Sequence, residues 1–204
     1  MTSPGSGASG PASAGVVAPP VPLVNVANAL TLVRIVLVPV FLVVLFVDDG
    51  TSATWRWAAF AVFAVASLTD TFDGDLARRW GLVTDFGKIA DPIADKALTG
   101  AALVGLSLLG ELAWWVTITI AVREIGVTLL RFWVLRHGVI PASRGGKIKT
   151  MLQTVALGLA IMPLPAAFAP VVAVLVFAAV VVTVVTGLDY LVRALRLRAR
   201  ARAS

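Results

Sequence analysis

The sequence contains no cysteine, one histidine and one tyrosine among 204 residues, and only 14% of its residues are charged. Without cysteine, neither disulfide bonds nor thiolate metal ligands are available. Any bound metal must therefore be held by oxygen ligands or by His137. The low charge, together with 59% hydrophobic residues and a mean hydropathy of +0.94, is not typical of a water-soluble globule. These values predict a helical membrane protein.

The net charge is +6, yet the basic residues lie at the ends of apolar segments and not in one basic domain. This distribution is typical of membrane topology and argues against a nucleic-acid partner. The closing segment RALRLRARAR is interpreted in the same way, as an anchor that faces anionic lipids. We therefore expect membrane lipids, and no nucleic acid, as partners.

The chain divides into a polar start, a long apolar region and a basic end. Residues 1–20 are rich in Gly, Ser, Ala and Pro and contain no basic residue, which predicts a disordered cytoplasmic tail and not a signal peptide. Six apolar spans follow, each near the ~20 residues needed to cross a bilayer. They lie at 28–47, 54–80, 87–109, 112–136, 147–164 and 168–192. We expect an all-α fold, a six-transmembrane-helix bundle over residues 21–195, and a basic tail at 196–204.

Two details of this bundle follow from single residues and loops. Lys and Arg follow the second, fourth and sixth spans, which predicts that these loops and both termini are cytoplasmic. Pro92 could begin the third helix, but a span starting there would be barely long enough to cross the bilayer. We therefore expect the third helix to enter near Phe86 and to bend at Pro92.

Carboxylates gather at the cytoplasmic ends of the second and third spans. Asp70 and Asp73 are three residues apart, Asp91 and Asp95 are four apart, and such spacings place each pair on one helix face. Ionised carboxylates inside a membrane cost about 2.5–3.5 kcal/mol each, and close ones also repel. Divalent metal compensates this charge with oxygen ligands, so four aspartates predict a site for two Mg²⁺ or Mn²⁺ ions. Simple helix capping is the alternative interpretation.

Small and basic residues accompany the carboxylates. Gly74 and Ala77 leave room for a flat ligand group beside the metals, although close helix packing would also explain them. Arg78 could bind a phosphate through two parallel hydrogen bonds, and Thr84 could donate to a second phosphoryl oxygen.

The stretch DTFDGDLAR at 70–78, followed after eight residues by Gly87-x3-Asp91-x3-Asp95, resembles the full signature of the CDP-alcohol phosphotransferase family. The resemblance extends more loosely from Asn25 to Arg193. It implies that a CDP-linked lipid binds with its diphosphate on two metal ions. An alcohol then attacks the lipid-side phosphorus and releases CMP, without a covalent enzyme intermediate.

The same resemblance assigns roles to residues of the site. It implies metal ligation by Asp70, Asp73, Asp91 and Asp95, with Asp95 also the general base on the attacking hydroxyl. Binding of the CDP-lipid is expected from Gly74, Ala77, Arg78 and, less directly, Thr84. Asn28 and Thr31 on the first span are expected to line this site, and Arg34 either joins them or reaches lipid headgroups.

Basic residues beyond the signature point to the acceptor. Arg123 and Arg131 lie within the fourth span, and Arg144, Lys147 and Lys149 lie in the loop that follows it. These basic residues predict a phosphate-bearing acceptor, with Arg123, Arg131, Arg144 and Lys147 as the candidate ligands, while loop topology or an internal ion pair with Glu124 is the alternative.

Within the family, the sequence looks most like bacterial members that join CDP-diacylglycerol to sn-glycerol 3-phosphate. Members that make cardiolipin or phosphatidylinositol phosphate are close alternatives. The resemblance also implies a homodimer in the bacterial cytoplasmic membrane, with the active site facing the cytoplasm. Outside this family, a divalent-cation transporter or a catalytically silent lipid-binding scaffold would also carry intramembrane acids.

Overall fold

The computed structural model describes residues 26–80, 85–134 and 144–203. Within these ranges, only the backbone is described for some helical residues. These are 26–28, 70–80, 85–92, 95, 131–132, 134, 144 and 200–203. All regular structure in the described residues is helical, which confirms the predicted all-α class.

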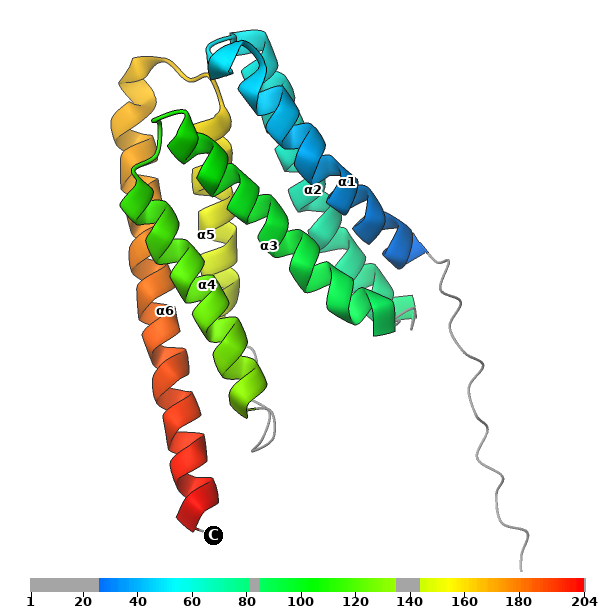
Figure 1. Cartoon of the computed structure of the whole chain (residues 1–204), viewed down its shortest axis with the longest axis vertical. Helices are drawn as coiled ribbons and strands as arrows, with labels where there is room; N and C mark the ends of the chain where they lie inside the picture. Colours follow the sequence, from blue (N-terminus) through cyan, green and yellow to red (C-terminus); the bar gives the residue numbers. More distant parts are fainter. Residues whose placement is uncertain (1–25, 81–84, 135–143, 204) are drawn as a thin grey trace, which may run out of the picture.

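Six α-helices and two short 3₁₀ helices follow one another along the chain (Figure 1). The α-helices are α1 (Val26–Phe46), α2 (Ala53–Trp80), α3 (Asp85–Leu108), α4 (Trp114–Val134), α5 (Arg144–Ile161) and α6 (Ala169–Ala203). The 3₁₀ helices are η1 (Val47–Gly50) and η2 (Ala166–Phe168). Each predicted span overlaps one α-helix, so the predicted number and order of helices are confirmed.

Two helix boundaries bear on the sequence expectations. Helix α3 begins at Asp85, ahead of Pro92, as the preferred interpretation required. The expected bend at Pro92 stays a prediction. Helix α6 continues to Ala203, so the basic segment after residue 192 is helical in its described part.

The helices run up and down between two ends of the molecule (Figure 1). The start of α1, the end of α2, the start of α3, the end of α4 and the end of α6 lie at one end, here called the motif end. The opposite end, called the far end, holds η1, the turn between α3 and α4, and η2. Helix α1 packs on α2 and α3, α6 packs on α4 and α5, and contacts of α5 with α2 and α3 join the two groups.

The buried face of α1 changes character along its length. Phe41 and Leu45 are fully buried in an apolar core that includes Leu106 of α3. Toward the motif end, the buried residues of α1 are Thr31 and Arg34, each 1% exposed. The helix therefore presents an apolar face at the far end and a polar one at the motif end.

Arg56 in the first turns of α2 ties three segments together at the far end. Its Nη1 and Nη2 donate to the Glu111 carboxylate at 2.7 and 2.6 Å, and its Nε and Nη2 donate to the carbonyls of Ile161 and Ala160, each at 2.8 Å. These two carbonyls belong to the last turn of α5. Carbonyls in the last turn of a helix have no N–H partner within the helix. Arg56, which is 5% exposed, thus caps α5 and anchors the α3–α4 turn.

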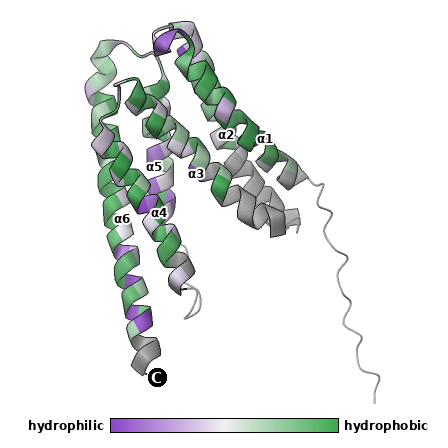
Figure 2. Cartoon of the chain, viewed as in Figure 1, coloured by the Kyte–Doolittle hydropathy of each residue, from purple (hydrophilic) through white to green (hydrophobic). Residues whose placement is uncertain are grey.

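Hydrophobic residues make up much of the helices (Figure 2), and many large ones are exposed. Val43, Val122 and Val174 are 69%, 66% and 66% exposed. Among the described residues, Ala29–Gly50 and Ala166–Ala199 are long and apolar enough to cross a bilayer. An apolar surface of this extent indicates a membrane protein.

We predict that Arg56→Lys lowers the unfolding temperature in detergent, because lysine cannot make the paired bonds to Glu111 and also reach two carbonyls. A hydrogen bond to a charged group contributes about 1.5–3 kcal/mol, so the loss should be of that order. Arg193→Lys is the matched control, because Arg193 forms an exposed pair with Asp189, 2.9 Å apart, within α6. Equal unfolding temperatures for the two variants would contradict the assigned role of Arg56.

Candidate functional site

The acidic residues predicted to bind metal lie on two helices that contact each other. Asp70 and Asp73 are in the last turns of α2, and Asp91 and Asp95 are in the first turns of α3. Residues 81–84 connect the helices, so Trp80 and Asp85 are at most about 18 Å apart. The backbone therefore brings both acidic segments to the motif end.

The four aspartate side chains lie outside the described residues, and their convergence remains a prediction. No group of three or more acidic or histidine side chains that could hold a metal occurs in the part of the chain with described side chains. The same limit applies to other predicted site residues. These are Asn28, Gly74, Ala77, Arg78, Arg131 and Arg144, whose side chains are not described, and Thr84, which lies in the gap at 81–84.

A second group of charged side chains, the Glu124 cluster, joins three helices near the motif end. Lys96 Nζ of α3 and Arg123 Nη1 of α4 donate to the Glu124 carboxylate, each at 3.1 Å, and Lys149 Nζ of α5 also donates to it. The Lys149 and Glu124 side chains are 8% and 18% exposed. A single carboxylate thus holds three cations in a mainly apolar bundle.

Arg123, predicted to bind an acceptor phosphate, is already engaged by α6. Its Nε donates to the Thr183 carbonyl at 3.2 Å and its Nη2 donates to Thr186 Oγ1 at 3.1 Å. Gly187 makes this contact possible, because a Cβ there would lie 3.0 Å from Arg123 Cγ. Arg123 therefore links α4 to α6 in addition to pairing with Glu124.

The sequence prediction named Lys149 with Arg144 and Lys147 among the loop cations but chose Lys147 as the site residue, and it did not single out Lys96. Lys147 is exposed, whereas Lys149 is 6% exposed and lies on the buried face of α5 with Gln153 and Ala156. Lys149 and Gln153 are four residues apart, and Gln153 and Ala156 are three apart, which places all three on one helix face. This spacing could have identified Lys149 as a buried residue. Lys96 gave no such signal, because its partner Glu124 lies on another helix.

A cavity of about 460 Å³ lies between α3, α4 and α5 beside this cluster. Lys96, Glu124, Lys149 and Gln153 contribute to its wall. Gln153 Oε1 is buried and has no hydrogen-bond partner among the described residues. Thr99, one helical turn after Asp95, also lines the cavity, which places it next to the acidic segment of α3.

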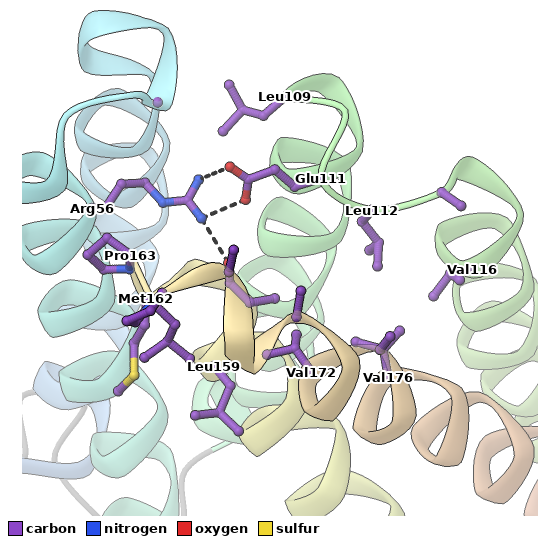
Figure 3. A pocket seen from close by; sticks show the side chains of 18 of the residues that line it. Arg56, Leu109, Glu111, Leu112, Val116, Leu159, Met162, Pro163, Val172 and Val176 are labelled. Atoms are coloured by element: carbon purple, nitrogen blue, oxygen red, sulfur yellow. Dashed lines mark hydrogen bonds and ion pairs between the residues drawn. The ribbon is translucent and has the colours of Figure 1, made fainter.

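A larger cavity of about 720 Å³ lies at the far end, between the start of α2, the α3–α4 turn and the α5–α6 connection. Figure 3 shows Arg56 and Glu111 pointing toward each other beside apolar side chains that include Leu159 and Val176. None of the predicted site residues lines it. Size alone therefore does not identify the functional site of this chain.

Comparison with known proteins places most of the chain in one family pattern. The pattern described as CDP-alcohol phosphatidyltransferase matches residues 24–185. A protein of Mycobacterium tuberculosis (strain H37Rv) named probable phosphatidylglycerophosphate synthase is 55% identical over 174 residues, which cover 85% of this chain and 83% of the relative. The Escherichia coli (strain K12) CDP-diacylglycerol–glycerol-3-phosphate 3-phosphatidyltransferase is 42% identical over 140 residues, covering 65% of this chain and 74% of that protein.

We predict that Gly187→Ala destabilises the protein, because the added Cβ pushes against an Arg123 side chain that three partners hold in place. Overpacking of this kind typically costs about 1–3 kcal/mol. Gly126→Ala in α4 is the control, since a Cβ there meets nothing within 4 Å and alanine favours a helix by up to about 1 kcal/mol. Thermal unfolding in detergent measures both, and a Gly187→Ala variant as stable as Gly126→Ala would refute the close contact.

Proposed function

The chain belongs to the CDP-alcohol phosphatidyltransferase family, and we propose that it transfers the phosphatidyl group of CDP-diacylglycerol to sn-glycerol 3-phosphate. The products are phosphatidylglycerophosphate and CMP. The observation that carries this proposal is the 55% identity to a probable phosphatidylglycerophosphate synthase over 85% of the chain. The name of the Escherichia coli relative, at 42% identity, supports the same donor and acceptor.

Two Mg²⁺ or Mn²⁺ ions are the proposed cofactors. The donor set supports them, because Asp70, Asp73, Asp91 and Asp95 offer only oxygen ligands, which both ions prefer, and because α2 and α3 bring these residues to one end. When bound, the ions would stabilise negative charge on the diphosphate. Capping of helix ends does not require four acids at helical spacings on two contacting helices.

The remaining chemistry is assigned to side chains of this chain. Asp95 takes the proton from the acceptor hydroxyl, whose oxygen attacks the lipid-side phosphorus as the bond to CMP breaks. Gly74, Ala77, Arg78 and Thr84 hold the CDP moiety. Asn28 and Thr31 line the same site, and the burial of Thr31 on α1, the helix that packs on α2 and α3, supports this placement.

The acceptor phosphate is proposed to bind beside the Glu124 cluster. The predicted residues were Arg123, Arg131, Arg144 and Lys147, and to these we add Lys96 and Lys149 because both line the cavity next to α3. Two lysines, together with Arg123 held between Glu124 and α6, favour an anionic acceptor over a neutral alcohol. Inositol phosphate and phosphatidylglycerol are also anionic, so acceptor identity depends on the names of the relatives.

We propose that all six helices span the bacterial cytoplasmic membrane with the motif end in the cytoplasm. Basic residues of α5 and α6 gather at that end, as the positive-inside rule requires. Exposed tryptophans mark the opposite interface at the starts of α2 and α4, where Trp55, Trp57, Trp114 and Trp115 are 42–53% exposed. A homodimer is proposed from the family resemblance, and the segments 1–20, 21–195 and 196–204 remain the proposed division of the chain.

A divalent-cation transporter is a weaker proposal. Such a protein needs polar groups through the whole thickness of the bundle, so that an ion can cross. Instead, the described core toward the far end includes Phe41, Leu45 and Leu106, and the buried charge there, Arg56, is neutralised by Glu111. This arrangement supports chemistry at one membrane face.

We predict that Asp95→Asn reduces CMP release from CDP-diacylglycerol at least about 100-fold, the size of a typical general-base contribution. The amide keeps the shape of the side chain but cannot accept the proton. Asp189→Asn is the matched control, because Asp189 is 49% exposed and pairs with Arg193 on α6. Undiminished turnover by Asp95→Asn, with both variants folded, would remove Asp95 from the mechanism.

We predict that glycerol 3-phosphate is the preferred acceptor when purified protein, CDP-diacylglycerol and Mg²⁺ are incubated with one acceptor at a time. Inositol phosphate, serine and phosphatidylglycerol complete the panel, and lipid products are identified by mass spectrometry. A main product other than phosphatidylglycerophosphate would overturn the acceptor assignment. CMP release with that other acceptor would still support the reaction class.

A further inference from the structure

The proposed chemistry gives no role to Glu124, although this residue organises the most highly charged group of described side chains in the bundle interior. Three positive charges, on Lys96, Arg123 and Lys149, surround its one negative charge. Among the described side chains, the cluster therefore carries a surplus of two positive charges. A surplus held in a mainly apolar bundle is costly unless an anion approaches it.

The surplus faces the cavity of about 460 Å³ through the two lysines. Lys96 and Lys149 line that cavity, whereas Arg123 does not and is tied to α6. An ammonium group has three donors, and among the described residues each lysine gives one of them to Glu124. The other donors are available to a phosphate in the cavity, whose charge would match the surplus.

Glu124 is what gathers these lysines from separate helices. Lysine side chains are flexible, and without a carboxylate between them two ammonium groups repel and turn toward water. Lys96 is the more exposed of the two, with a side chain 36% exposed against 8% for Lys149. The carboxylate therefore fixes the positions of the two donors before any acceptor binds.

We propose that Glu124 is a positioning residue that holds Lys96 and Lys149 for the acceptor's phosphate and so selects a phosphorylated alcohol over a neutral one. This inference rests on the proposed phosphatidyl transfer. Glu124 acts through the lysines and not on the reacting atoms. Its loss is therefore expected to change KM for the acceptor much more than kcat.

The test is Glu124→Gln, assayed with CDP-diacylglycerol and Mg²⁺ against glycerol 3-phosphate and, separately, glycerol. We expect KM for glycerol 3-phosphate to rise about tenfold, the effect of losing roughly one charge-assisted hydrogen bond. The preference for glycerol 3-phosphate over glycerol should fall with it, while KM for CDP-diacylglycerol changes less than about twofold. An unchanged KM for glycerol 3-phosphate would overturn the inference.

Glu111→Gln is the matched control, because Glu111 also pairs with a buried cation but lies at the far end. It should lower the unfolding temperature without changing KM for glycerol 3-phosphate. If Glu124→Gln does not fold, Lys96→Gln replaces it, because this partly exposed side chain tolerates substitution better. It should raise the same KM, and a normal KM in this variant would count against the proposal.

A double variant separates positioning from a structural role. If Glu124 acts through the lysines, Glu124→Gln should raise the KM of a Lys149→Gln background by clearly less than the roughly tenfold expected in the wild type. Fully multiplicative effects would show that Glu124 acts elsewhere. Wild-type protein that releases no CMP with glycerol 3-phosphate would refute the proposed function, whereas normal turnover with an insensitive Glu124→Gln would refute this inference alone.

Discussion

The cost of holding charge inside an apolar helical bundle is the constraint on which the rest of this structure depends. Charged side chains in the interior need partners, because a lone buried ion is expensive. At the far end, Arg56 meets this need with Glu111 and the last carbonyls of α5. Near the motif end, three cations share Glu124. Both arrangements line a cavity, but the first pairs one cation with one carboxylate, whereas the second keeps a surplus of positive charge among the described side chains.

The two ends of the bundle therefore differ in structure and in charge. The far end is closed by an ion pair, a helix cap and an apolar core, so it provides a rigid support for the helices. The motif end combines the buried polar face of α1, the acidic segments of α2 and α3, and the cations of the Glu124 cluster. This asymmetry supports the proposal that a charged lipid donor and a charged acceptor bind toward the motif end. That asymmetry suits an enzyme working at a membrane surface.

Much of the fold could be predicted from the sequence because most of the helices coincide with apolar runs of about the length that crosses a bilayer. The acidic motif was equally readable, since helical spacing alone places Asp70 with Asp73 and Asp91 with Asp95. Contacts between helices that are far apart in the sequence could not be predicted from helical spacing. Arg56 is 5% exposed and pairs with a residue 55 positions away, a contact that helical spacing does not indicate. Lys149 was recognised as a loop cation, but its contact with Glu124 depends on which face of α5 turns toward α4.

The claim that unites these observations is that the carboxylates of α2 and α3 share divalent ions at the motif end. Anomalous diffraction from crystals of the full chain grown with Mn²⁺ tests it most directly, because manganese is located without any assay of turnover. The expected result is manganese density between the last turns of α2 and the first turns of α3, in contact with the aspartates at 70, 73, 91 and 95. Manganese bound only elsewhere on the protein, with these aspartates pointing apart, would contradict it.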